Sequence, residues 1–166
     1  MPIYNHNGQL GQPINISTFV RHAQNAVAPS GPLPNLGGVG TNLGVNAAAL
    51  NNIGPVDQIT KAYGLLTCAS VIYLSTSPAA VAGAWVHHAN AGHVGGGDVN
   101  TAIARLGNPP AASILVIFAH PGNHDNGYAQ SIATIVASGI LANNVVEIPN
   151  LIIPQFGINN LGCIGC

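Results

Sequence analysis

Apolar residues are grouped along the chain in short runs, which predict β-strands better than long helices. Residues 65–74 are apolar and β-branched at both odd and even positions, which is typical of a strand buried on both faces. Residues 75–80 carry turn-forming Ser, Thr and Pro, and residues 81–89 and 113–119 are two further strand candidates. We therefore expect an antiparallel hairpin of the first two strands, followed by a third strand.

Helical spacing is clearest in residues 128–141, where Ile132, Ile135, Val136 and Ile140 recur at intervals of three and four. A shorter helix is predicted to end at Arg105, with Asp98 accepting its first free N–H groups. Residues 145–153 read as one or two closing strands, and no fixed-period repeat occurs. Strands around two helices predict an α+β fold, a layered domain with a β-sandwich-like core.

The N-terminal third has a different texture from the rest. Residues 1–55 are rich in Asn, Gly and Pro, which interrupt any long periodicity. We expect a loop-rich lead-in there, with a short helix near residues 18–27. Residues 56–166 are predicted to form the catalytic core of the same single domain.

Charge is scarce, and this excludes several classes of protein. Of 166 residues, 48% are hydrophobic and only 4% are charged, with a net charge of −1. Nucleic-acid binding needs several clustered Lys or Arg, whereas the three here are scattered singly. A mean hydropathy of +0.37 with almost no net charge predicts a chain that folds rather than a disordered one. Low charge also reduces repulsion between copies, so self-association is physically plausible.

Membrane and export signals are weak in this sequence. No run approaches the ~18 apolar residues of a membrane helix, so no membrane span is expected. The first residues lack a basic segment followed by an apolar one, so classical secretion is not predicted. The expected location is the cytoplasm, or the exterior by a non-classical route.

The cysteine count is odd, which rules out a fully paired disulfide framework. Cys163 and Cys166 lie three apart at the end of the sequence, where an end-of-chain disulfide or two loose thiols is the plain interpretation. One Cys pair cannot fill a four-ligand zinc site. Cys68, alone in the middle of the chain, is the thiol with potential chemistry.

The expected hairpin gives Cys68 a partner. If the turn is centred on residues 77–78, Leu74 pairs with Val81 and Cys68 lies directly opposite His87. Opposed residues of an antiparallel pair have Cβ atoms about 4.5–5.5 Å apart, which is close enough for a Cys–His dyad. Because side chains alternate across a strand, His88 is expected on the other face.

A thiol beside an imidazole can act as a nucleophile. A neighbouring His⁺ lowers a thiol pKa and produces the reactive thiolate, and the same imidazole can protonate a leaving amine. The plain alternative is that Cys68 is a buried apolar residue, the commonest role of a free cysteine, and that His87 is a satisfied core histidine.

The residues around this pair resemble a known group of enzymes. Leu66-Thr67-Cys68-Ala69-Ser70-Val71, followed after a turn by Gly83-Ala84-Trp85-Val86-His87, resembles the nucleophile and histidine strands of the bacterial glutamine deamidase superfamily. That superfamily includes the chemoreceptor glutamine deamidases and the catalytic domain of cytotoxic necrotizing factors. The order of the strand, polar loop, helix and closing strands that follow is also similar.

The resemblance implies a cysteine-dependent protein-glutamine deamidase that needs no cofactor. The Cys68 thiolate would attack a side-chain carboxamide, backbone N–H groups around Cys68, Thr67 included, would stabilise the oxyanion, and His87 would protonate the departing ammonia. The product would be Glu in place of a reactive Gln on a partner protein, as in a bacterial effector toxin. Asn90 and backbone carbonyls of the lead-in are the candidates for the group that orients the imidazole.

A second histidine-rich segment supports a metal-dependent hydrolase as the alternative. Gly122-Asn123-His124-Asp125, with Gly97-Asp98 upstream, is similar to two motifs of calcineurin-like metallophosphoesterases. The early Asp-x-His motif and the later histidines of such a two-metal site are missing. A simpler zinc site could draw on His120, His124 and Asp125, together with His87, His88 or His93.

A third class is a non-enzymatic assembly or binding protein, whose surface is rich in Asn, Gly and Ala. This class predicts that Cys68 is unreactive, whereas the deamidase predicts a thiol that alkylates readily. The reactivity of Cys68 therefore separates the two.

Overall fold

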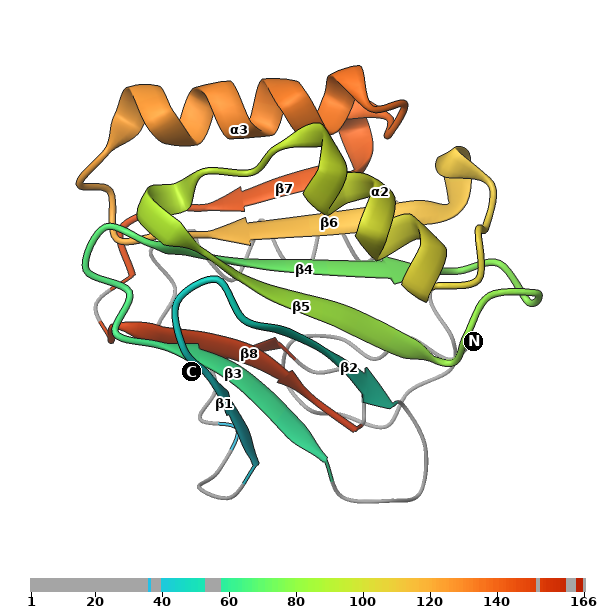
Figure 1. Cartoon of the computed structure of the whole chain (residues 1–166), viewed down its shortest axis with the longest axis horizontal. Coiled ribbons are helices and arrows are strands. Elements are labelled where there is room, and N and C mark those ends of the chain that lie inside the picture. The colour runs from blue at the N-terminus through green and yellow to red at the C-terminus, as the bar shows by residue number, and fades with distance from the viewer. Residues whose placement is uncertain (1–35, 37–39, 53–57, 152, 161–163, 166) are drawn as a thin grey trace.

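The structure is a computed structural model, which describes residues 36, 40–52, 58–151, 153–160 and 164–165. Its described elements form three layers, with two helices above a five-stranded sheet and a four-stranded sheet below it (Figure 1). The predicted α+β class, with two packed sheets, is thereby confirmed.

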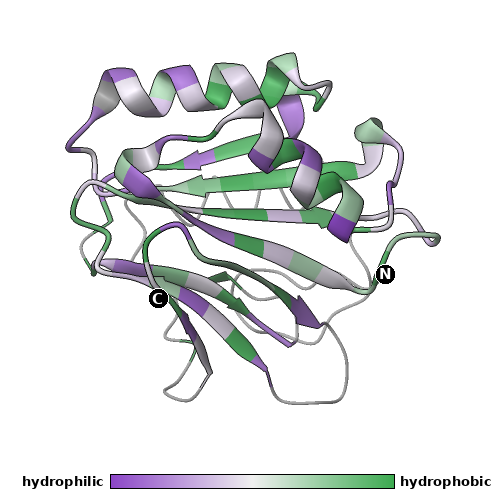
Figure 2. Ribbon diagram, viewed as in Figure 1, coloured by the Kyte–Doolittle hydropathy of each residue, from purple (hydrophilic) through white to green (hydrophobic). Residues whose placement is uncertain are grey.

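The larger sheet holds the hairpin that the sequence predicts. Its strand order is β2-β5-β4-β6-β7, and all neighbours are antiparallel except β6 and β7, which are parallel. The bounds are β2 Ala48–Asn52, β4 Ala69–Ser75, β5 Gly83–Ala89, β6 Ile114–Ala119 and β7 Val145–Ile148. Strands β4 and β6 are buried along their whole length, as their two-sided apolar pattern predicts (Figure 2).

The smaller sheet packs against one face of the larger sheet. Its order is β1-β3-β8-β9, with β1 Thr41–Leu43, β3 Ile59–Tyr63, β8 Gln155–Asn159 and β9 Ile164–Gly165. A shared apolar core, which we call the inter-sheet core, contains Cys68 and the residues Leu43, Ile72, Leu74, Val86, Phe156 and Ile158.

The helices cover the opposite face of the larger sheet. They are α2 Gly96–Arg105 and α3 Asp125–Ala137, and they pack over a second core, the helix-side core, which includes Tyr73, Phe118 and Tyr128. Short 3-10 turns, η1 Asn90–Gly92, η2 Ala111–Ser113 and η3 Ala142–Asn144, join these elements. Neither described helix has the length and apolar composition needed to cross a bilayer.

Several boundaries differ from the sequence predictions. Strands β1 and β2 lie in the segment expected to be loop-rich, and β3 was not predicted, because these strands are short and carry polar residues. Helix α3 begins earlier than the apolar spacing suggests. It also ends earlier, because Gly139, just after the helix, has a positive φ of 101°. The predicted helix near residues 18–27, and Cys163 and Cys166, lie outside the described residues.

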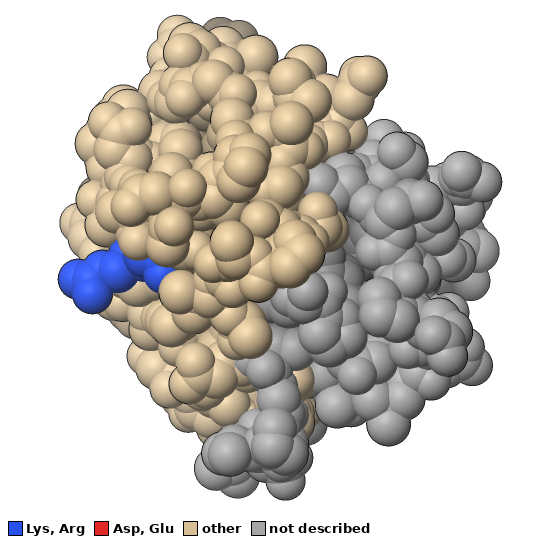
Figure 3. All heavy atoms as spheres, turned by 90° about the vertical axis from the view of Figure 1, so that its right-hand side faces the viewer, with Lys and Arg blue, Asp and Glu red and all other residues tan. Residues whose placement is uncertain are grey.

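Helix α2 ends at Arg105 as predicted, but Asp98 caps it differently. The carboxylate lies in the first turn and accepts a hydrogen bond from the Gly95 N–H (Oδ2–N 2.8 Å), instead of standing at the N-cap itself. On the face shown in Figure 3, the described atoms are almost all uncharged, with basic atoms confined to one spot and no acidic atoms in view. That face therefore offers no cluster of cations for a phosphate backbone.

Candidate functional site

The hairpin register differs from the predicted one by three residues. Strands β4 and β5 pair Ser70 with His88 and Val71 with His87. The predicted pairing of Leu74 with Val81 is wrong because the Val81 N–H instead donates to the Leu106 carbonyl at the end of α2 (3.0 Å), and β5 begins only at Gly83. A shift by an odd number of residues moves every side chain of one strand to the other face relative to its partner.

This register separates Cys68 from His87. Cys68 belongs to the inter-sheet core, whereas His87 pairs with Val71, a residue of the helix-side core. The predicted Cys68–His87 contact across the ladder is therefore corrected by the structure. His88 pairs with Ser70 and lies instead on the inter-sheet face, which Cys68 shares.

Cys68 lies just before β4, at the end of the hairpin farthest from the turn. The ladder ends where Ala69 pairs with Ala89, so Cys68 and Asn90 are the next residues beyond its last pair, and Asn90 belongs to η1. The residue directly opposite His88 is Ser70. The Cys68 Sγ lies 4.0 Å from Asn90 Oδ1, and the thiol is free and only 7% exposed.

The imidazole of His88 is held in one tautomer. Its Nδ1 lies 2.8 Å from the carbonyl oxygen of Leu43 in β1, and because a carbonyl only accepts, Nδ1 carries the proton. In the neutral imidazole, Nε2 then presents a lone pair. Nε2 is buried, and no group in the described part of the chain hydrogen-bonds to it.

The Leu43 carbonyl belongs to the N-terminal lead-in, but it orients His88, whereas the sequence suggested lead-in carbonyls or Asn90 as the group that orients His87. The other candidate, Asn90, contacts the sulfur instead. An asparagine amide carries both an acceptor and donors, so the same side chain can face a thiol or, after rotation, a thiolate.

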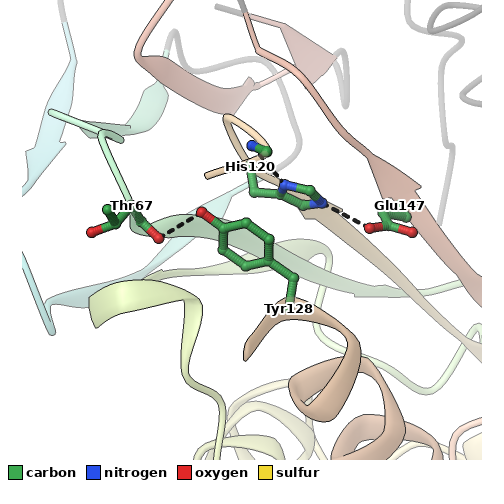
Figure 4. Close-up of polar contacts among 5 residues, drawn as sticks. Thr67, His120, Tyr128 and Glu147 are labelled. Atoms are coloured by element: carbon green, nitrogen blue, oxygen red, sulfur yellow. Dashed lines mark hydrogen bonds and ion pairs between the residues drawn. The ribbon is translucent and has the colours of Figure 1, made fainter. Parts of the chain in front are cut away.

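The segment leading into Cys68 bends at Leu66 and Thr67, and residues at the start of α3 fix this bend. Asn123 Nδ2 donates to the Leu66 carbonyl (2.8 Å), and the Tyr128 hydroxyl donates to the Thr67 carbonyl (2.7 Å). Figure 4 shows the second of these bonds. The Thr67 side chain is exposed, so Thr67 contributes its backbone to this arrangement.

His120 holds Tyr128 in place. Its ring stacks on the Tyr128 ring with a centroid distance of 3.9 Å and an interplanar angle of 26°. Its Nε2 lies 2.8 Å from Glu147 Oε1, and its Nδ1 accepts from the Gly122 N–H (3.0 Å) (Figure 4). Both ring nitrogens are therefore committed to protein partners.

These contacts leave the predicted metal site with little support. His120 has no nitrogen free for a metal, and the exposed His124 meets Tyr128 edge-on. Within the part of the chain that the structure describes, no three His, Cys, Asp or Glu side chains are grouped as metal ligands. The side chain of Asp125 lies outside the described part.

His87 lies in a different electrostatic environment from His88. Burial lowers the pKa of His87, and the nearby charge of Asp98 on α2 opposes this effect. Burial and the charge of Asp98 both raise the pKa of Tyr73, which lies far above its usual value. His87 and Tyr73 thus both face the start of α2.

Sequence reasoning does not connect two of these residues with Cys68. The predicted turn assigns His88 to the wrong face, so the sequence offers it only as a possible zinc ligand. Tyr128 is predicted only as part of a helix, since nothing in its spacing links it to Thr67, which lies 61 positions earlier.

The sequence matches no protein-family model and no protein of characterised function at significant similarity.

Proposed function

We propose that the protein is a cysteine-dependent deamidase that converts glutamine to glutamate on a partner protein, with Cys68 as nucleophile and His88 as acid and base. The observation that carries this proposal is the state of His88. Its tautomer is fixed by the Leu43 carbonyl, and its unpartnered Nε2 is buried on the face that also holds the Cys68 thiol. A buried nitrogen without a partner costs free energy, and a catalytic role is one of the reasons for which proteins keep such a group.

The reaction balances with these two groups and water. In the structure the Cys68 thiol meets Asn90 and not His88, so the sulfur must first turn toward Nε2, which then takes the thiol proton. The sulfur bonds to the carboxamide carbon, and the carbonyl electron pair moves to oxygen. When the tetrahedral intermediate collapses, the C–N bond breaks and the nitrogen leaves as ammonia with the proton from His88. Water then hydrolyses the thioester, which gives a glutamate side chain and restores the thiol.

The resemblance to the glutamine deamidase superfamily supports the choice of a carboxamide as substrate. It concerns residues 66–71 around Cys68 and residues 83–87, which end in His87, and the corrected register leads us to assign the role of that histidine to the neighbouring His88. A bacterial effector acting on a host or partner protein fits this proposal. The metal-dependent alternative gains no support from His120, because that residue is committed to Glu147 and Gly122.

The two adjacent histidines allow a matched experiment. Ammonia release and the +1 Da mass shift are measured with α-casein, a glutamine-rich protein, for the wild type, Cys68→Ser, His88→Gln and His87→Gln. We expect activity in the wild type and in His87→Gln, and a loss of about 100-fold or more in His88→Gln. Wild-type ammonia release no faster than that of Cys68→Ser contradicts the deamidase, and full activity of His88→Gln contradicts the dyad.

A further inference from the structure

The bend before Cys68 has an unusual arrangement of its peptide groups. Successive carbonyls of a regular strand point in opposite directions, but those of Leu66 and Thr67 both accept hydrogen bonds from residues near the start of α3. The donors are side chains, Asn123 and Tyr128, rather than a neighbouring strand. Two separate side chains therefore hold two consecutive peptide planes.

The direction of each carbonyl fixes the direction of the next N–H. The described peptides are all trans, so the N–H of the next residue points opposite to each carbonyl. With the carbonyls of Leu66 and Thr67 directed to the α3 side, the N–H groups of Thr67 and Cys68 are directed away from it. No hydrogen bond engages either N–H within the described residues.

The core that holds Cys68 lies on that same side of the larger sheet. Helix α3 contributes Tyr128 to the helix-side core, whereas Cys68 belongs to the inter-sheet core on the opposite face. Two adjacent N–H donors that point to the nucleophile's side are the usual components of an oxyanion hole. Their direction depends on the bonds made by Asn123 and Tyr128.

We propose that Tyr128 and Asn123 are positioning residues, which orient the N–H groups of Thr67 and Cys68 toward the oxyanion that forms when Cys68 attacks an acyl carbon. This inference rests on the proposed nucleophilic role of Cys68. It goes further by assigning a function to the contacts between α3 and the bend. His120 and Glu147 support this arrangement. His120 stacks on the Tyr128 ring, and Glu147 in turn holds His120 through a bond to its Nε2.

Two reagents separate this role from a general loss of structure. Iodoacetamide reacts with Cys68 by displacement, in which the C–S bond forms as iodide leaves and no oxyanion develops. With p-nitrophenyl acetate, the sulfur attacks the ester carbon, an oxyanion forms, the C–O bond breaks and p-nitrophenolate leaves. Both reactions need the same sulfur, but only the second needs the two N–H donors.

The variants are Tyr128→Phe and Asn123→Ala, with Tyr73→Phe as control. Tyr73 is also a buried tyrosine, and its hydroxyl has no hydrogen-bond partner in the described part of the chain. Alkylation of Cys68 is followed by peptide mass spectrometry, and acylation as the p-nitrophenolate release that exceeds that of Cys68→Ser. Thermal unfolding confirms that each variant is folded.

We expect Tyr128→Phe to slow acylation by about tenfold, because losing one oxyanion donor outright costs roughly 100- to 1,000-fold and a loosened donor costs less. Its alkylation rate should stay within about twofold of the wild type. Asn123→Ala should show the same difference between the two reactions, and Tyr73→Phe should change neither rate.

Equal losses in both reactions, or no loss of acylation, overturn the positioning role. Acylation that is sensitive to Tyr128→Phe in a protein that releases no ammonia from casein upholds the positioning role and refutes the deamidase. Wild-type acylation equal to that of Cys68→Ser refutes both.

Discussion

Two adjacent histidines of β5 have opposite surroundings because strand side chains alternate between faces. His88 is fully buried in the inter-sheet layer, with one nitrogen bonded to Leu43 and the other without a partner among the described residues. His87 faces α2 and Asp98. At this scale, single substitutions can separate a chemical role from a structural one.

Substitution of His88 should make Cys68 less reactive toward alkylation. In His88→Gln the base that accepts the thiol proton is missing, so the iodoacetamide rate at pH 7 should fall at least about tenfold. His87→Gln serves as the control and should react like the wild type. The rates are measured between pH 5 and 9 by mass spectrometry of the Cys68 peptide, and identical profiles in the two variants would refute the assignment of His88.

His87 should contribute to the pH dependence of stability. Its pKa is lowered in the folded state, so between the folded value and the unfolded value of 6.5 the unfolded chain binds more protons. The contribution is fully present above pH 6.5 and is lost as the pH falls through the folded pKa. Urea unfolding at pH 7.5 and pH 5 should therefore show a smaller acid-induced loss of stability for His87→Gln than for the wild type. An equal or larger loss in the variant would contradict this sign.

At the scale of elements, the site depends on how η1 and the start of α3 meet the bend before β4. Gly92 at the end of η1 has a φ of 68°, and a Cβ added there would overlap the Cδ1 and Cε1 atoms of the Tyr128 ring. The ring that hydrogen-bonds to Thr67 therefore packs closely against the backbone of η1. Glycine is required here both by conformation and by space.

Gly92→Ala should destabilise the protein more than Gly64→Ala. Gly64 has nearly the same φ, 69°, but a Cβ there would meet nothing within 4 Å, so this variant reports the conformational cost alone, about 1 kcal/mol. The excess in Gly92→Ala reports the displacement of Tyr128, and we expect it to add about 1–3 kcal/mol. The free energies of unfolding in urea give the comparison, and equal values would show that Tyr128 moves aside without cost.

At the scale of the whole molecule, both sheets are needed to build the site. His88 belongs to β5 of the larger sheet and Cys68 directly precedes β4, but the carbonyl that orients His88 belongs to β1 of the smaller sheet. A second bond crosses the same layer, from Ser70 Oγ to the Phe156 carbonyl (3.0 Å). The inter-sheet core therefore holds both the fold and the geometry of the proposed dyad.

Truncation within this core should be costly. Phe156 in β8 is fully buried between the sheets, and Phe156→Ala should lower the free energy of unfolding by about 3–5 kcal/mol. Leu141→Ala provides the control because Leu141 is 51% exposed, and it should change stability by less than about 0.5 kcal/mol. Chemical unfolding curves test both variants, and a cost below 1 kcal/mol for Phe156→Ala would mean that the sheets are not tightly packed.

The sequence by itself determined the local elements with strong patterns. The two-sided apolar runs of β4 and β6 and the helical spacing in α3 are local properties, and so is the choice of Cys68 as the thiol with potential chemistry. Only the tertiary structure decided which histidine shares a face with that thiol, because the hydrogen bond from the Val81 N–H to the Leu106 carbonyl moves the turn. The register is thereby shifted by three residues, and an odd shift exchanges the two faces of β5. The Leu43 carbonyl and the Tyr128 hydroxyl are equally non-local, since each reaches its partner only after sheets and helices have packed.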